Sequence, residues 1–569
     1  MGLIKVLPEI LINKIAAGEV VERSASVVKE LIENSIDAGA NEIVIEILRG
    51  GKKLIRVSDN GLGMSKEDAI LAFERHATSK IYDEDDLYKI STMGFRGEAL
   101  PSIASVSKVL MVTSEKGSSS GIKIEMDGGK LLSISDVGPS PGTVVEVRDL
   151  FFNTPARLAF LKGDNTEISH IVGTVESEAL GHPEISFTLK HNKKVILSLP
   201  RTNRSIERIH QIYGRGVVEN LLEVRSGPLS ENNRITLTGY ISNPPFSRAD
   251  RSLQAAFINK RPIRNPVISH AISEGYHTLM MKDRYAVAFL FLDIDSIEVD
   301  INVHPAKREV RLRNPSLIHD IIAKSIRERL SEKTTEETFQ IDGEKIDLPG
   351  VKEAIERYMK RYEKASLEEE RQIDFGLPLR LKSTISKDFL HAFESYIIAV
   401  NKDSVMIIDQ HAAHERILYE KLKKEKIEIQ RLLVPETIEL SKKESLLLAE
   451  NLDKIKTLGL DVEGFGSNTF IIRSIPAILQ REDPKGVLLD ILTELEKSQG
   501  LSRTKEVERM KTLMACHGAI KASQPLNPEE MENLMEELKG TELSHTCPHG
   551  RPTMIKLRLS DLEKLFKRK

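Results

Sequence analysis

The sequence predicts an α+β protein built from two globular halves that are joined by a linker. An amphipathic helical pattern over residues 27–38 leads into two alternating segments, 41–48 and 53–59, which flank the turn Arg49–Gly51. A turn of this kind between alternating segments is typical of a hairpin, and hence of an antiparallel sheet. The hairpin argues against a Rossmann fold, whose sheet is parallel. A polar, charged stretch over residues 331–376 then precedes further strand patterns.

The composition limits the classes of function to be considered. The 569 residues include 82 Lys and Arg against 85 Asp and Glu, a net charge of -3. No global basic field therefore indicates a nucleic-acid partner, and any DNA contact must come from local patches. Because the chain has no run of about 18 apolar residues and no signal-peptide pattern, we expect a cytoplasmic protein with no membrane partner. Its two cysteines are too few for a secreted disulfide framework.

A chain of this length divides into about three or four modules of ordinary size. The boundaries we expect are residues 1–215 for a first domain, 216–330 for a second subdomain, 331–376 for a linker and 377–569 for a C-terminal domain. The linker contains the charged helical run VKEAIERYMKRYEKASLEEER. We interpret this run as a solvated helix whose only function is to space the two globular halves. After it, SYIIAV and SVMIID are strand patterns.

The helix over residues 27–38 has an apolar and a polar side. The apolar side chains are Val28, Leu31, Ile32 and Ile36, and the polar ones are Glu30, Glu33, Asn34 and Asp37. Gly39 is expected to end the helix. A charged stripe is usually only a solvated face, so a functional interpretation depends on the motifs that follow it.

Three further motifs follow in order. In DNGLG, residues 59–63, the glycines permit a close backbone approach, and the Asp59 carboxylate could accept a hydrogen bond from an adenine amino group. RHATSK spans residues 75–80, and GFRGEAL, residues 94–100, leads into the helical pattern ALPSIASVS. Glycines ahead of a helix leave backbone N–H groups free to face phosphates. The sequence contains no GxxxxGK[ST], which excludes an ordinary P-loop enzyme.

In this order the four elements resemble the ATPase family that includes gyrase B, the Hsp90 chaperones, histidine kinases and the MutL mismatch-repair proteins. KELIENSIDAGA, RHATSKI, GFRGEALPSIASVS and FFNTPARLAFL are similar specifically to MutL, and the resemblance covers essentially the whole chain. It implies a GHKL (Bergerat) ATPase α/β sandwich and a second subdomain like ribosomal protein S5. After the linker, it implies an α/β C-terminal domain for dimerisation and DNA cleavage.

The resemblance also implies roles for single residues. Glu30 would activate the attacking water, Asn34 would hold Mg²⁺ against the phosphates of ATP, and Asp59 would read adenine. Glu30 and Asn34 are one turn apart, so one rigid helix can present a base and a metal ligand to the same side. The residues implied to line the nucleotide loops are Gly61, Gly63, Thr78, Ser79, Gly94, Gly97 and Thr143, with Arg96 and Gly142 near them.

Two basic features lie further along the chain. SIEVDINVHPAKREVRL predicts two strands around a turn, and the resemblance implies that Lys307 in this turn reaches the γ-phosphate. Without the resemblance, a surface lysine explains the pattern equally well. Lys260, Arg261 and Arg264 in NKRPIRN form a candidate patch for DNA phosphates, and a solvated patch is the alternative.

The second half carries candidate metal ligands. In DQHAAHERILYE, residues 409–420, helical spacing places His411 and Glu415 on one face. Both cysteines also lie close to a histidine, in ACHGAIKA and in CPHGRPT. If the CPH segment is extended, its Cys and His side chains project to the same side. Thiolate, imidazole and carboxylate together suit Zn²⁺ or Mn²⁺. The full set is Asp409, His411, Glu415, Cys516, Cys547 and His549. The alternatives are two buried thiols or a disulfide, which a cytosolic setting disfavours.

DQHAAHERILYE, ACHGAIKA, CPHGRPT and FIIR resemble the endonuclease form of MutL. The resemblance implies metal-dependent DNA nicking with Asp409 and Glu415 as catalytic residues. QRLLVP is similar to the short peptide by which repair proteins dock on the replication sliding clamp, through Gln430, Leu432 and Leu433. A core position for the leucines is the alternative.

The sequence thus predicts a homodimer in which ATP closes the N-terminal domains around DNA. This closure would couple mismatch recognition by a MutS-like partner to nicking. The alternative is a matchmaker scaffold without nuclease activity, whose Cys and His hold a structural zinc. A function as an Hsp90-type chaperone would share the ATP motifs but would leave DQHAAHERILYE unexplained. A histidine kinase is expected to carry a sensor and a phospho-acceptor helix ahead of its ATP motifs.

Overall fold

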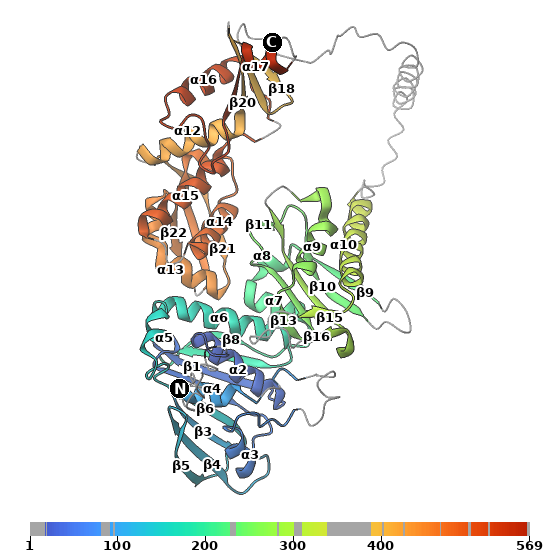
Figure 1. The fold of residues 1–569 in the computed structure, drawn as a ribbon, viewed down its shortest axis with the longest axis vertical. Coiled ribbons are helices and arrows are strands. Elements are labelled where there is room, and N and C mark those ends of the chain that lie inside the picture. Colours follow the sequence, from blue (N-terminus) through green and yellow to red (C-terminus); the bar gives the residue numbers. More distant parts are fainter. Residues whose placement is uncertain are drawn as a thin grey trace, which may run out of the picture. The chain divides into compact units, whose positions relative to one another are not determined.

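The structure is a computed structural model of the chain (Figure 1). The residues that it describes are 18, 20–80, 92–94, 97–227, 235–280, 284–300, 310–337, 389–400, 403–424, 427–466, 468–498, 502–521 and 524–565. Arg96, Lys307 and the charged run over residues 351–371 lie outside the described residues. The chain forms two compact units, one from residues 1–330 with 427–510 and one from residues 331–426 with 511–569.

An eight-stranded mixed sheet forms the base of the N-terminal part (Figure 1). Its strand order is β5-β4-β3-β6-β2-β1-β7-β8. The strands are β1 (Glu42–Leu48), β2 (Leu54–Asp59), β3 (Lys108–Ser114), β4 (Gly121–Asp127), β5 (Lys130–Val137), β6 (Gly142–Arg148), β7 (Ser186–His191) and β8 (Lys194–Leu199). β1 and β2 are antiparallel and joined through the 3-10 turn η1 (Arg49–Gly51), which confirms the predicted hairpin. β1 and β7 run parallel.

Helices cover one face of this sheet. They are α2 (Ser24–Asp37), α3 (Lys66–Leu71), α4 (Ala99–Ser105), α5 (Pro155–Phe160), α6 (Asp164–Gly181), α7 (Ser205–Tyr213) and α8 (Arg215–Val218). β1 buries Ile43, Ile45 and Ile47 in the same core as the apolar side of α2, while the alternate residues of the strand stay partly exposed. The predicted helix over residues 27–38 is confirmed, and Gly39, with φ +70°, follows its end.

A second sheet has the order β13-β12-β15-β10-β9. Its strands are β9 (Leu221–Ser226), β10 (Thr236–Ser242), β12 (Gln254–Ile258), β13 (Arg261–Ile263) and β15 (Ala288–Asp293). Short pairs join β11 (Ser247–Arg248) to β14 (Tyr285–Ala286) and β16 (Val299–Asp300) to β17 (Arg311–Leu312). The helices are α9 (Pro266–Tyr276) and α10 (Pro315–Glu337), with 3-10 turns η3 (His277–Leu279) and η4 (Ser296–Glu298). α10 therefore continues into the stretch over residues 331–376.

Residues 427–510 form a three-stranded sheet with β23 in the middle. Its strands are β21 (Ile429–Glu439), β22 (Asp461–Gly464) and β23 (Thr469–Pro476), and its helical elements are α13 (Lys442–Thr457), η5 (Ala477–Leu479) and α14 (Pro484–Lys497). α15 (Arg503–Gly518) begins in this segment and ends in the second unit. A capping box at Ser441 and Glu444 satisfies the first backbone N–H groups of α13.

The second unit contains a four-stranded antiparallel sheet in the order β18-β19-β20-β24. Its elements are β18 (Phe389–Ala392), β19 (Tyr396–Val400), β20 (Ser404–Asp409), α12 (Gln410–Lys424), α16 (Pro528–Lys539), β24 (Met554–Arg558) and α17 (Leu559–Leu565). Ile397, Ile408 and Ile417 pack against α16 in its core. The strands predicted from SYIIAV and SVMIID, and the helix predicted from DQHAAHERILYE, are confirmed. Across the described part of the chain, no helix combines the length and apolarity that a bilayer crossing requires.

Candidate functional site

A cavity of about 750 Å³ opens beside α2 and β2 in the N-terminal part. This volume lies within the range of about 300–1,000 Å³ that is usual for small-molecule sites. The predicted nucleotide residues that line it are Glu30, Asn34, Asp59, Gly63, Thr78, Ser79, Gly94, Gly97 and Thr143. The structure thus brings together, in one cavity, four motifs that lie far apart in the sequence.

Asp59 is held at the end of β2 by three hydrogen bonds. Its Oδ1 accepts from the backbone N–H of Gly61 at 2.9 Å and of Thr143 at 3.3 Å, and its Oδ2 accepts from the Ser35 hydroxyl at 2.8 Å. Burial raises the pKa of Asp59, although these hydrogen bonds act in the opposite direction. A carboxylate offers about four acceptor positions, so one remains for a donor in the cavity. The contact with Ser35 was not predicted, because it joins α2 to the end of β2 across 24 residues of the chain.

Two glycines of the cavity wall occupy positions that no other residue fits. Gly63 has φ +72°, and a Cβ there would lie 1.9 Å from the carbonyl oxygen of Ser114. Gly97 has φ +63°, and its Cβ would lie 2.4 Å from the carbonyl oxygen of Ala77. Both loops therefore run against neighbouring backbone in a left-handed conformation that favours glycine. Gly61 and Gly142 are not among the lining residues, and both pack around Asp59 instead.

The polar face of α2 differs in one respect from the prediction. Glu30, which is only 8% exposed, and Asn34 both line the cavity. Glu33 does not line it: this side chain is buried and forms an ion pair with Lys29 at 3.1 Å. α2 packs against α6 as well as against the sheet, so burial extends around more of the helix than its apolar stripe indicates.

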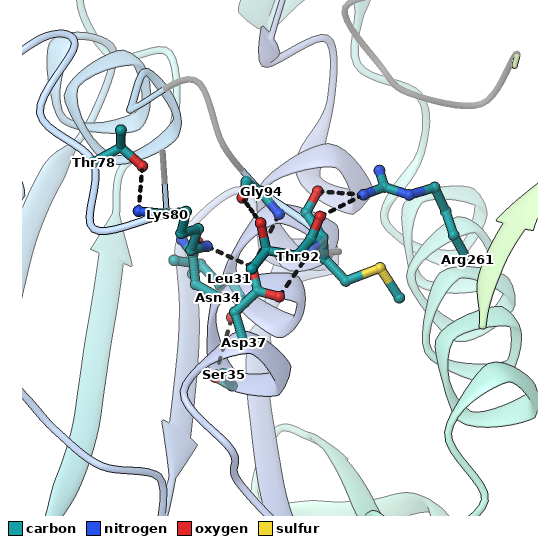
Figure 2. A network of polar contacts seen from close by, with 10 residues as sticks. Leu31, Asn34, Ser35, Asp37, Thr78, Lys80, Thr92, Gly94 and Arg261 are labelled. Atoms are coloured by element: carbon teal, nitrogen blue, oxygen red, sulfur yellow. Dashed lines mark hydrogen bonds and ion pairs between the residues drawn. The ribbon is translucent and has the colours of Figure 1, made fainter. Parts of the chain in front are cut away.

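Asp37 connects α2 to both loops above it (Figure 2). Its Oδ1 accepts from the backbone N–H of Met93 at 2.8 Å, and its Oδ2 accepts from that of Gly94 at 2.9 Å. Lys80 forms an ion pair with Asp37 and donates to Oδ1 of Asn34 at 3.3 Å. Asp37 and Lys80 were not predicted as site residues, although both lie within the MutL-like strings KELIENSIDAGA and RHATSKI.

Arg261 requires a correction, because the structure removes it from the candidate DNA patch. It lies on β13, is 4% exposed, and its Nη2 donates to the carbonyl oxygens of Thr92 at 2.8 Å and Met93 at 2.9 Å (Figure 2). A buried guanidinium that is bonded to two carbonyls cannot reach a DNA phosphate. Lys260 forms an ion pair with Glu184 at 2.8 Å, and Arg264 is exposed. Only these two residues remain available to the patch.

The second unit gathers five of the six predicted metal ligands. α12 carries His411 and Glu415, which form one group with Cys516 of α15. Glu415 forms a second group with Cys547 and His549. In each group the ligand atoms all lie within 4.8 Å of one another. Glu415, which is 3% exposed, belongs to both groups and is the centre of the cluster.

Hydrogen bonds set the protonation of the cluster. Nδ1 of His411 lies 2.9 Å from the carbonyl oxygen of Ile520, which can only accept, so Nδ1 carries the proton and Nε2 is left for a metal. Burial opposes ionisation of Glu415, yet hydrogen bonds from His549 and Cys547 lower its pKa. Burial and then the Glu415 carboxylate raise the pKa of Cys516 to about 12. A bound cation would supply the charge that these thiols need to ionise.

Two details of this cluster differ from the expectation. Asp409 is in neither ligand group, and its Oδ1 caps α12 by accepting from the backbone N–H of Ala412 at 3.0 Å. The expected extended segment at Cys547 and His549 is wrong, because the N–H of Gly550 donates to the carbonyl oxygen of Cys547 at 2.9 Å and closes a turn. The turn nevertheless places Nδ1 of His549 2.7 Å from Oε1 of Glu415.

The candidate clamp peptide lies at the start of β21. The pairing of β21 with β23 shifts register between Arg431 and Glu436. Gln430 is exposed, Leu432 is half-buried, and Leu433 is fully exposed. Leu433 is therefore not a core residue, and the core alternative is excluded for this position.

These features define an ATPase of the GHKL class joined to a second α/β module. A family model described as "Histidine kinase-, DNA gyrase B-, and HSP90-like ATPase" matches residues 22–131. The model "DNA mismatch repair protein, C-terminal domain" matches residues 209–331, and "MutL C terminal dimerisation domain" matches residues 390–526. The predicted fold class is confirmed.

Known proteins similar to this chain are mismatch-repair proteins. It is 40% identical to the DNA mismatch repair protein MutL of Geobacter sulfurreducens and 38% identical to that of Geotalea daltonii, covering 99% of both chains in each case. A crystal structure of the N-terminal domain of a DNA repair protein is 28% identical, with a TM-score of 0.50, over 57% of this chain and 99% of that one. The chain belongs to the MutL family of DNA mismatch repair proteins.

Proposed function

We propose that the chain is an ATP-dependent homodimeric clamp that couples a MutS-like mismatch sensor to metal-dependent nicking of DNA. The observation that carries the proposal is the meeting of Glu30, Asn34 and Asp59 in one cavity, in a chain that also gathers metal ligands around Glu415. The working parts are an ATPase domain over residues 1–215, a second subdomain over residues 216–330, and a C-terminal dimerisation and endonuclease domain over residues 377–569.

In the ATPase domain, Glu30 takes a proton from the attacking water while Asp59 accepts a hydrogen bond from the adenine amino group. Asn34 would hold Mg²⁺, which neutralises phosphate charge. Because both groups project from one helix, water and γ-phosphate are positioned together, which is most of what phosphoryl transfer requires. In this proposal Lys307 reaches the γ-phosphate, and Arg96 belongs to the residues near the nucleotide loops.

In the C-terminal domain, the donor set fits a borderline ion such as Zn²⁺ or Mn²⁺, because it combines two imidazoles, a carboxylate and two thiols. His411, Glu415, Cys516, Cys547 and His549 would hold it, and the ion would polarise a DNA phosphate. Asp409 borders these ligands at the start of α12 and stays a predicted participant. Glu415 is buried, and its contact with His549 holds the carboxylate in place.

A plasmid assay tests the nuclease. The full chain should convert supercoiled plasmid to nicked circles in Mn²⁺, and Glu415→Gln protein should lose this activity, because the shared ligand of both groups loses its charge. Glu494→Gln on α14 is the matched control. If Glu415→Gln protein nicks at the parental rate, the cluster is not the nuclease site.

The second candidate is a scaffold without nuclease activity, whose C-terminal cluster holds a structural zinc. The two thiols favour it, since Cys-rich sites are typical of structural zinc. Anomalous scattering at the zinc edge, combined with the plasmid assay, separates the two. Zinc at the cluster without nicking under any metal condition would establish the scaffold.

The exposed part of β21 is proposed to dock on the sliding clamp through Gln430, Leu432 and Leu433. Gln430→Ala and Leu433→Ala should remove the stimulation of nicking by the clamp and leave the basal rate unchanged. Equal stimulation of the variants and the parent would reject this contact.

Lys260 and Arg264 are proposed to meet DNA phosphates, a sequence-independent contact that weakens as salt increases.

A further inference from the structure

Two helices of the second subdomain bring together a pair of histidines and a glutamate outside both sites described above. His270 and Glu274 are four residues apart on α9, so they share a face of that helix. His319 lies near the start of α10. His270 and His319 are 49 positions apart in the sequence, yet their rings are within hydrogen-bond distance of each other.

The packing of the two helices fixes these side chains. Ile268 and Ile272 of α9 share a core with Ile322 and Ile326 of α10. A Cβ at Gly275 would lie 2.7 Å from Cβ of Ile326, so the helices are in close contact here. The geometry of the polar cluster is therefore set by apolar packing and does not depend on an ion.

The potential ligand atoms converge on one point. Nδ1 of His270 lies 2.9 Å from Nε2 of His319, and Oε2 of Glu274 lies 3.2 Å from the same Nε2. All three atoms lie within 4.8 Å of one another. The donor atoms of a tetrahedral zinc site are separated by about 3.3 Å, given Zn–N and Zn–O bonds of about 2.0–2.1 Å. Only a small expansion of this cluster would admit the ion.

Neighbouring charges orient the cluster in the way that metal sites require. Nδ1 of His319 lies 3.1 Å from Oδ1 of Asp320, which can hold the Nδ1 proton, so Nε2, which faces Glu274 and His270, is the nitrogen that a metal would bind in place of a proton. Carboxylates play this part behind many metal-bound histidines. Glu274 uses its other oxygen, Oε1, for an ion pair with Arg327, which leaves Oε2 facing the histidines.

We propose that His270, Glu274 and His319 bind a divalent transition-metal ion of the Zn²⁺ class on the second subdomain. Two imidazole nitrogens and one carboxylate oxygen are a donor set that zinc accepts, with water in the fourth position. The ion would fasten the start of α10 to α9. The rival arrangement is a hydrogen bond from His270 to His319 with no metal.

Cobalt substitution in the full chain tests the proposal and separates this site from the C-terminal cluster. Co²⁺ bound by nitrogen and oxygen gives visible d–d bands, whereas cysteine ligands add near-ultraviolet charge-transfer bands. Wild-type protein should bind one more equivalent of Co²⁺ than His270→Ala/His319→Ala protein, and the difference spectrum should contain d–d bands alone. Exposed His210 on α7 supplies the matched control, and His210→Ala should match wild type.

Two conservative variants keep the test decisive if the double variant does not fold. Glu274→Gln retains the shape of the side chain and should bind more weakly. Asp320→Asn leaves all three ligands in place and should lower the affinity by about 10- to 100-fold. Equal Co²⁺ affinity in wild type and Glu274→Gln protein, or a difference spectrum with thiolate bands, would overturn the proposal.

Discussion

The placement of single side chains determines what the N-terminal cavity can do. Asp59 is half-buried with three of its acceptor positions occupied, so it presents a fixed acceptor to the cavity. Glu30 is buried on the same helix as Asn34. These positions support the proposed division of roles, with Asp59 as the acceptor for adenine and Glu30 as the acceptor of the water proton.

Glu30→Gln protein should keep its affinity for ATP and lose about 10²- to 10⁴-fold in kcat, because the proton acceptor is removed while the shape of the cavity is preserved. Steady-state hydrolysis and equilibrium nucleotide binding are the measurements. The control is Glu42→Gln, at an exposed position on β1. Parental turnover in Glu30→Gln protein would remove Glu30 from the mechanism.

Gly63→Ala should weaken nucleotide binding, because the new Cβ would collide with the Ser114 carbonyl and φ +72° is strained for alanine. The matched control is Gly138→Ala, where a Cβ meets nothing within 4 Å. Nucleotide titration and thermal unfolding of both variants decide the matter. Equal affinities would mean that the loop adapts and that its close approach to β3 is not needed for binding.

At the scale of elements, local patterns predicted the helices and hairpins, whereas contacts between elements escaped prediction. The periodicity of residues 27–38 and the turn Arg49–Gly51 are local, and both predictions are confirmed. The burial of Arg261 and Glu33 depends on neighbours that are remote in sequence, on the loop at residues 92–93 and on α6. The sequence pattern therefore placed Arg261 in a candidate DNA patch and Glu33 on the polar side of the helix, whereas both side chains are buried in the structure.

Arg261→Met should destabilise the protein by about 1–3 kcal/mol, because two buried carbonyls lose their donor. It should also slow ATP hydrolysis, since Arg261 positions the loop that Asp37 holds from the other side. Urea unfolding and kcat are measured beside Arg264→Met, at an exposed position on the same segment. Unchanged stability with weaker DNA binding would instead restore Arg261 to the DNA patch.

Glu178 on α6 gives a pH-dependent prediction. Burial, and then the nearby Glu33, raise the pKa of Glu178 to about 8 in the folded protein. The unfolded chain releases this proton near its ordinary pKa of 4.5, so the contribution of Glu178 to stability falls as pH rises from about 4.5 to about 8. Glu178→Gln removes this fall, and its advantage in urea unfolding over wild type should grow between pH 5 and pH 9. A constant difference would show that the carboxyl titrates normally.

At the scale of the whole molecule, the sequence predicted more of the function than of the contacts that support it. Motifs of several adjacent residues, such as DQHAAHERILYE, carried the family resemblance and located most of both candidate sites. The cluster at His270 and His319 was not found, because neither residue stands in a motif and only the packing of α9 on α10 brings them together. Sites assembled by tertiary packing from single residues leave little trace in local sequence.

The proposed function depends on one cavity beside α2, which is proposed to bind ATP with its phosphates at Glu30 and Asn34. The most direct test is a crystal structure of the full chain with Mg²⁺ and a non-hydrolysable ATP analogue. We expect the adenine amino group on the Asp59 carboxylate, the metal on Asn34 and the γ-phosphate next to Glu30. Nucleotide bound elsewhere on the chain, or a base that makes no contact with Asp59, would contradict it.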